Sequence, residues 1–246
     1  MSRVIRTVIF DIDGTMYDYD ACDPVSTKAV QEYCREQLGI SEERFYQSLS
    51  VAGRMVRQRI GYRCASIHNR LLRYQCMMEL WGVPLFPHVQ EMHRIYWDTL
   101  MEEMRPFPGL KAWMESLKQM GIRIGVGTNM TAEIQYRKLE RLGVSSYVDW
   151  LVSSEEAGVE KPDAKFFSQC REKSGMDPEE CLFVGDSLNG DVAAALTCGM
   201  QALLFAPETG RTAADCCEAA MPDGRIYHVI PSFEGCRGVG FLGSEQ

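Results

Sequence analysis

Short apolar runs alternate with longer amphipathic stretches over most of the chain. The apolar runs are about four to eight residues long and most end at a glycine or an acidic residue, as is typical of buried parallel strands. The predicted strands are 4–11, 122–128, 149–154, 181–186 and 201–206. Most amphipathic stretches end in glycine, a helix stop signal, and the predicted helices are 109–121, 130–143, 162–175 and 189–199. This alternation predicts a doubly wound parallel sheet of the α/β class, with a Rossmann-like arrangement.

One long segment breaks the alternation. Between about residues 20 and 103 no strand pattern is convincing, and the apolar spacing favours four helices. They are predicted at 24–38, 41–60, 65–81 and 87–104. We therefore predict two domains, an α/β core formed by residues 1–18 and 105–246 and a helical insert at 19–104. A further run at 225–230 is expected to form an edge strand of the core.

Composition narrows the class of protein. With 246 residues, 46% of them apolar, the chain can bury a full core. Its net charge of −8 disfavours binding to a nucleic-acid polymer, which needs a basic footprint. No run approaches the roughly 18 apolar residues of a membrane span, and the N-terminus does not have the pattern of a signal peptide. The ten cysteines are scattered, so we expect reduced thiols in a cytoplasmic protein. Its oligomeric state is not predicted.

Polar residues follow four of the predicted strands. Because the carboxyl ends of parallel strands meet at one edge of a sheet, these side chains are expected to converge there. Four of them are carboxylates and only one is an ammonium, so a divalent cation that prefers oxygen ligands, such as Mg²⁺, would balance the site. The residues are Asp11, Asp13, Thr128, Asn129, Lys161, Asp186 and Asp191.

Each of these residues also has a simpler interpretation. Asp11 and Asp13 could form a solvated turn, Lys161 could lie on the surface, and Thr128 could cap the helix that follows it. Asp191 is compatible with a direct metal ligand, with a group that orients a ligand, and with a carboxylate at a helix N-terminus. The presence of all of them at successive strand ends favours a functional site.

The ordered set of motifs resembles the haloacid dehalogenase superfamily. D-x-D-G-T, a strand-end threonine, Lys-Pro and G-D-x-x-x-x-D occur in that order across residues 8–200. The insert resembles the α-helical cap of the phosphatase-rich subgroup, and "SSEEAGVEKPDAKFF" is similar to nucleotide and sugar-phosphate monophosphatases. The resemblance implies a Mg²⁺-dependent phosphatase that acts on a small phosphorylated metabolite, a 5′-nucleotide or a sugar phosphate, through an aspartyl-phosphate intermediate.

The resemblance implies roles for the first two aspartates. Asp11 would be the nucleophile and a metal ligand. Asp13 would protonate the leaving group, activate water and offer its backbone carbonyl to the metal. Two residues further along a strand, Asp13 is expected to share a face with Asp11. Dehalogenases lack an acid at this position because chloride needs no proton, so Asp13 favours a phosphatase.

The later motifs imply the rest of the site. Asp186 would be a metal ligand, and Asp191 would ligate the metal through water or orient another ligand. Thr128, the backbone of Asn129 and Lys161 would hold the phosphate oxygens. The hydrolysis of phosphomonoesters is very slow without a catalyst, so most of this set is expected to act electrostatically.

The helical insert contains a local excess of positive charge. Residues 45–78 include no Asp or Glu but six arginines, which are Arg54, Arg57, Arg59, Arg63, Arg70 and Arg73. A solvated helical face is the common explanation, and a field that attracts an anionic substrate or a partner is the alternative. The turn with Tyr62 and Arg63 is predicted to bind substrate when the cap closes, and the turn at 38–43 is the other candidate.

Two other functions remain compatible with the motifs. A phosphomutase would keep the aspartyl-phosphate and phosphorylate a second hydroxyl, although related mutases often have a bulkier apolar residue where Thr15 stands. A non-catalytic binding protein could use the same fold. The substrate itself is not predicted, because no diagnostic motif occurs in the insert.

Overall fold

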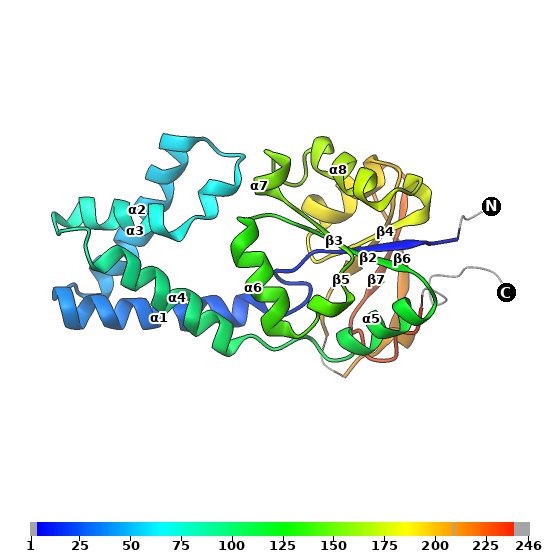
Figure 1. Ribbon diagram of the computed structural model, residues 1–246, viewed down its shortest axis with the longest axis horizontal. Helices are drawn as coiled ribbons and strands as arrows, with labels where there is room; N and C mark the ends of the chain where they lie inside the picture. Colours follow the sequence, from blue (N-terminus) through cyan, green and yellow to red (C-terminus); the bar gives the residue numbers. More distant parts are fainter. Residues whose placement is uncertain (1–3, 209, 239–246) are drawn as a thin grey trace. The chain divides into compact units, whose positions relative to one another are not determined.

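The protein consists of two compact units. A computed structural model describes residues 4–208 and 210–238 (Figure 1). One unit is formed by residues 1–18 and 105–246 and the other by Tyr19–Met104. The first unit has the α/β fold, and the second is helical.

A seven-stranded sheet forms the centre of the α/β unit, in the order β3-β2-β1-β4-β5-β7-β6. All neighbouring pairs are parallel except β6 with β7. The strands are β1 (Thr7–Phe10), β2 (Arg123–Thr128), β3 (Trp150–Ser153), β4 (Cys181–Gly185), β5 (Gln201–Phe205), β6 (Cys217–Ala220) and β7 (Ile226–Ile230). The predicted parallel sheet of the α/β class is confirmed. Strand β1 lies inside it, between β2 and β4, and all four of its residues are buried.

Helices cover both faces of this sheet (Figure 1). They are α5 (Leu110–Gln119), α6 (Ala132–Leu142), α7 (Ser154–Ala157), α8 (Ala164–Ser174) and α9 (Ala193–Thr197). Phe167 of α8 packs on Phe183 of β4, with ring centroids 5.2 Å apart. Phe10 of β1 packs edge-on against Trp113 of α5 at 5.2 Å. Aromatic contacts with α8 and α5 therefore hold the central strands β4 and β1 in place.

Two details of the α/β unit differ from the predictions. The strand predicted at the edge, now β7, lies inside the sheet between β5 and β6. The edge strand is β6, which was not predicted because its residues are almost all exposed and show no apolar alternation. The helix predicted at 189–199 begins as a π-helix, Leu188–Val192, before α9.

The helical unit contains four α-helices, α1 (Tyr19–Leu38), α2 (Glu42–Ile60), α3 (Arg70–Trp81) and α4 (His88–Glu103). No strand occurs in residues 19–104, all of which the structure describes. The first helix begins earlier than predicted, because Pro24 lies inside α1 instead of starting it. The third predicted helix is split into a 3₁₀ turn and α3 at Asn69, whose side chain accepts a hydrogen bond from Leu71 N at 2.9 Å.

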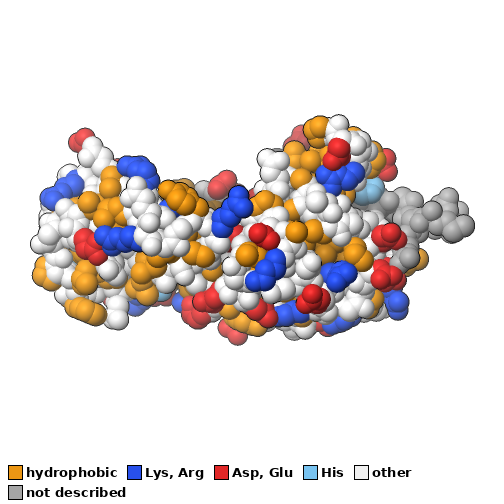
Figure 2. Space-filling view, turned by 90° about the horizontal axis from the view of Figure 1, so that it is seen from above, with side chains coloured by type: hydrophobic (Ala, Val, Ile, Leu, Met, Phe, Trp, Pro, Cys, Tyr) orange, Lys and Arg blue, Asp and Glu red, His pale blue; other side chains and the backbone are white. Residues whose placement is uncertain are grey.

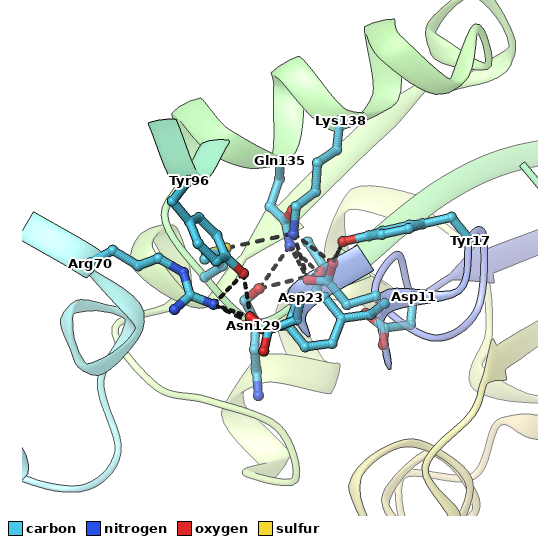
Figure 3. Close-up of polar contacts among 12 residues, drawn as sticks. Asp11, Tyr17, Asp23, Arg70, Tyr96, Asn129, Gln135 and Lys138 are labelled. Atoms are coloured by element: carbon cyan, nitrogen blue, oxygen red, sulfur yellow. Dashed lines mark hydrogen bonds and ion pairs between the residues drawn. The ribbon is translucent and has the colours of Figure 1, made fainter. Parts of the chain in front are cut away.

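A buried arginine connects three helices of this unit. Arg70 of α3 lies 2.6 Å from Asp23 of α1, which also accepts hydrogen bonds from Tyr96 of α4 at 2.5 Å and from Tyr19 at 3.0 Å (Figure 3). Arg70 is only 7% exposed. The interpretation of the arginine-rich segment as a solvated face is therefore wrong for Arg70, whereas Arg63 is exposed.

Positive and negative side chains are interspersed over the face drawn in Figure 2. All ten cysteines are free. Within residues 4–208 and 210–238, no helix combines the length and the apolar character that crossing a bilayer requires.

Candidate active site

The ends of the central strands bring the predicted site residues to one edge of the sheet. Phe10 of β1 is in register with Val126 of β2 and Val184 of β4. Asp11 follows β1 directly, and its backbone N–H donates to Val184 O at 2.9 Å. Thr128 is the last residue of β2, and Asp186 follows β4. All of these residues belong to the α/β unit.

Three carboxylates cluster at this edge. Asp11, Asp186 and Asp191 each place one oxygen within 4.8 Å of the others. Lys161 Nζ lies 2.8 Å from Asp11 Oδ1 and 2.7 Å from Asp191 Oδ1. The side chains of Lys161 and Asp191 are 5% and 1% exposed, and this buried ammonium contacts two of the three acids, Asp11 and Asp191. The chain itself supplies too little positive charge for this cluster.

The pKa values of these groups reflect that imbalance. The pKa of Asp11 is raised to about 7, because burial and the charges of Asp191 and Asp13 together outweigh the lowering effect of Lys161. Partial desolvation and the charge of Asp191 also raise the pKa of Asp186. Burial lowers the pKa of Lys161, but Asp11 and Asp191 outweigh it and the net shift is upward. An all-oxygen set of crowded acids fits a hard divalent cation.

Two glycines allow the carboxylates to approach the backbone. Gly14 has a φ of +79°, and a Cβ on it would lie 2.3 Å from Asp186 Oδ2. A Cβ on Gly185 would lie 2.4 Å from Asp191 Oδ2. Any other residue at either position would displace an acid of the cluster.

Thr128 and Asn129 connect the end of β2 to its neighbours. Thr128 is buried, and its Oγ1 accepts a hydrogen bond from Gln135 Nε2 at 2.7 Å. It does not cap α6, whose N-cap residue is Thr131. The side-chain oxygen of Asn129 accepts a hydrogen bond from Lys161 N at 2.9 Å. The end of β2 and the lysine segment are thus joined directly.

Asp13 has a different cationic partner from Asp11. Lys138 Nζ of α6 lies 2.6 Å from Asp13 Oδ1 and 2.8 Å from Oδ2. Tyr17 donates to Oδ1 at 2.5 Å. Burial raises the pKa of Asp13, but Lys138 and the hydrogen bonds from Lys138, Tyr17 and Gln135 outweigh it and the pKa is lowered. The expectation of a shared strand face is wrong, because β1 ends at Phe10 and Asp13 lies beyond it, in an isolated bridge with Tyr17.

Gln135, Lys138 and Tyr17 were not predicted from the sequence. Gln135 and Lys138 are three residues apart, so they lie on one face of α6 (Figure 3). Both are fully buried, beside the apolar residues Leu139 and Leu142 of the same helix. The sequence feature that could have identified Gln135 and Lys138 is the presence of two polar residues at core-facing positions of an amphipathic helix.

Comparisons with known proteins identify the family. A model of the haloacid dehalogenase-like hydrolases matches residues 5–199. The chain is 34% identical to a ribulose-1,5-bisphosphate 5-phosphatase from Halopiger xanaduensis, over 91% of this chain and 94% of the relative. It is 30% identical to a glyceraldehyde 3-phosphate phosphatase from Methanopyrus kandleri, over 80% of this chain and 82% of the relative.

A solved structure has the same fold. The HAD phosphatase from Thermococcus onnurineus superposes with a TM-score of 0.69 at 23% identity, and the match covers 98% of this chain and 99% of that one. The predicted family and the predicted class of enzyme, a phosphoric monoester hydrolase, are confirmed by the family match and the named phosphatases. The chain belongs to the haloacid dehalogenase-like hydrolases.

Proposed function

We propose that this protein is a Mg²⁺-dependent phosphatase that hydrolyses a small sugar phosphate or 5′-nucleotide through an aspartyl-phosphate on Asp11. One observation carries the proposal: at the carboxyl edge of the sheet, the buried carboxylate of Asp11 lies 2.8 Å from Lys161 Nζ and within 4.8 Å of two further acids. A carboxylate held in this way faces the space where ligands of open α/β sheets bind. We propose Asp11 as the nucleophile.

The transferred phosphate needs positive charge around it. A carboxylate and one phosphate charge repel by about 4 kcal/mol at 4 Å with an effective dielectric constant near 20. Lys161 lowers this repulsion, and Thr128 and the backbone of Asn129 would donate hydrogen bonds to phosphate oxygens. Asp11, the Asp13 carbonyl, Asp186 and Asp191 would hold the cation.

When bound, Mg²⁺ would neutralise charge on the phosphoryl oxygens. The chain's own residues perform the proton transfers. Asp13 would protonate the leaving oxygen as the phosphorus–oxygen bond breaks and Asp11 takes up the phosphoryl group. Asp13 would then take a proton from the water that cleaves the aspartyl-phosphate and releases inorganic phosphate.

The named relatives favour a sugar phosphate over a nucleotide. The two reported above are named for the phosphates of a pentulose and a triose. We propose that the helical unit, Tyr19–Met104, acts as the cap that selects the substrate. The free thiols support a cytoplasmic protein, the compartment in which thiols stay reduced.

A panel of phosphorylated metabolites tests this function by phosphate release. The wild type with Mg²⁺ should hydrolyse sugar phosphates or nucleotides, a chelator should abolish the activity, and Asp11→Asn should be inactive but folded. If the isomer of a sugar phosphate accumulates without phosphate release, the protein is a phosphomutase. If wild type and Asp11→Asn are equally inactive towards the panel, the binding-protein alternative holds.

The proposed role of Arg63 has a separate test. Arg63→Ala should raise KM for a charged substrate much more than for 4-nitrophenyl phosphate. Arg54→Ala is the matched control, because Arg54 lies in the same arginine-rich segment but donates to Ser50 within α2. Equal effects of Arg63→Ala on both substrates contradict the role.

A further inference from the structure

The carboxyl group of Asp13 is held by side chains that no motif of the family resemblance includes. Lys138 contributes two short contacts, 2.6 Å to Oδ1 and 2.8 Å to Oδ2, and Tyr17 donates to Oδ1 at 2.5 Å. Gln135 reaches Oδ2 only at 3.4 Å. Figure 3 shows Gln135 and Lys138 extending from the same face of α6, with Tyr17 directed toward them.

These contacts treat the two oxygens of Asp13 differently. A carboxylate oxygen has two lone-pair sites. On Oδ1, both are occupied by short hydrogen bonds from Lys138 and Tyr17. On Oδ2, one site is occupied by Lys138, and the second has only the long contact with Gln135. Oδ2 therefore keeps the capacity to bind one more hydrogen.

Stability alone does not explain a lysine at position 138. Its side chain is 0% exposed, whereas that of Asp13 is 29% exposed. Buried ion pairs are often no more stable than apolar side chains of the same volume, because both charges lose their hydration. A charge in this position is better explained by what it does to Asp13.

A residue that contacts Lys138 has a strained backbone conformation. Met130, at the end of the β2 loop, has a φ of +119°, which costs a non-glycine residue about 1–3 kcal/mol. Its Sδ lies 3.7 Å from Lys138 Nζ, and its N–H donates to Ser154 Oγ at 2.8 Å. The strained backbone at Met130 thus accompanies a contact between its sulfur and the ammonium.

We infer that Lys138 is a positioning residue for the phosphatase reaction: with Tyr17 it fixes Asp13 Oδ1 and leaves Oδ2 to exchange the proton with the leaving group. This inference rests on the proposed function. In the first step Oδ2 takes the proton that a monoanionic phosphate ester carries and passes it to the leaving oxygen, while the phosphoryl group passes to Asp11. In the second step Oδ2 takes a proton from the attacking water. Gln135 has a different task, because it holds Thr128 and the Asn129 carbonyl at 2.7 and 2.9 Å.

Leaving groups of different basicity distinguish these tasks. An alkyl phosphate needs a proton on its leaving oxygen, whereas 4-nitrophenolate leaves without one. The ratio kcat/KM covers the steps up to the formation of the aspartyl-phosphate, so it reports the acid role alone. For Lys138→Met we expect kcat/KM to fall roughly 10- to 100-fold with the alkyl phosphate, part of the 10²–10⁴ of general acid catalysis, and only a few-fold with 4-nitrophenyl phosphate.

Three matched variants complete the experiment. Gln135→Met should lower kcat/KM equally for both substrates, because Thr128 and Asn129 contact the phosphate that the substrates share. Arg137→Met, which removes a cation from the same helix, should leave kcat/KM unchanged for both substrates. Lys138→Met in an Asp13→Asn background should cause no further loss, since the side chain that it positions has already changed.

The outcomes separate this inference from the proposed function. Equal losses on both substrates for Lys138→Met, in a protein with an active wild type, overturn only the inference. A wild type that releases phosphate from neither substrate, nor from any member of the metabolite panel, overturns both. If Lys138→Met does not fold by circular dichroism, Tyr17→Phe decides, because it removes one hydrogen bond to Oδ1 and keeps the ring. Tyr17→Phe should lower kcat/KM selectively for the alkyl phosphate, by a smaller factor than Lys138→Met. An equal loss of kcat/KM for the alkyl phosphate and 4-nitrophenyl phosphate overturns the inference.

Discussion

The buried ion pair of Asp13 and Lys138 gives an asymmetric prediction for stability. Asp13→Asn removes the negative charge that lies opposite the fully buried ammonium of Lys138. Lys138→Met removes the positive charge instead. It leaves a carboxylate that is 29% exposed and still accepts hydrogen bonds from Tyr17 and Gln135.

The burial of each partner sets the magnitude. Removing one member of a buried pair costs about 3–5 kcal/mol when the other stays uncompensated. Asp13→Asn should fall in this range because Lys138 is 0% exposed. Lys138→Met should cost only about 1–3 kcal/mol, the penalty for an under-satisfied polar group, because water and two side chains still solvate Asp13. Each kcal/mol corresponds to about 2–4 °C in Tm for a chain of 150–250 residues.

Urea and thermal unfolding of the metal-free protein, followed by circular dichroism, measure both values. The double variant Asp13→Asn with Lys138→Met should lose less than the sum of the single losses, because neither charge is then left alone. Arg137→Met is the control on the same helix, since its exposed pair with Glu133 at 3.6 Å is expected to contribute under about 0.5 kcal/mol. A larger loss for Lys138→Met than for Asp13→Asn, or additive losses in the double variant, refutes the reasoning.

Three further predictions concern the cation cluster and pH. Gly14→Ala should weaken Mg²⁺ binding about 10- to 100-fold in calorimetry, because the added Cβ displaces a ligating carboxylate. Gly39→Ala is the control, since Gly39 has similar backbone strain but open space around it, and it should leave Mg²⁺ binding unchanged. Because the pKa of Asp11 is raised from 3.8 to about 7, its contribution to the stability of the metal-free fold is present below pH 3.8 and is lost as the pH rises through 7. The stabilisation by Mg²⁺ should therefore grow from about pH 5 to pH 8, as measured by Tm, and Asp11→Asn should flatten it. The pKa of Asp13 is lowered, so its contribution to the stability of the fold is present above about pH 4 and is lost below it. The stability difference between wild type and Lys138→Met should therefore narrow in acid. A difference that stays constant with pH contradicts this prediction.

The local pattern of the sequence was enough to predict most of the α/β unit. Buried parallel strands are continuous apolar runs, so β1 to β5 were all located within a few residues. The acids, Thr128 and Lys161 could be identified because strand ends of one parallel sheet meet at one edge. The arrangement of β6 and β7 could not, because an exposed edge strand has no apolar alternation and strand order depends on long-range pairing.

The sequence by itself determined the sheet, the helical insert and the set of acids that needs a cation. Only the tertiary structure decided which cation each acid contacts. Lys161 lies against Asp11, while Lys138 lies against Asp13 although 125 positions separate the two residues in the chain. The physical reason is that an ion pair depends on distance and burial in three dimensions, whereas a sequence pattern records only the spacing of residues along one element. The role of a lysine on the buried face of α6 can be inferred only when the carboxylate that it contacts is known.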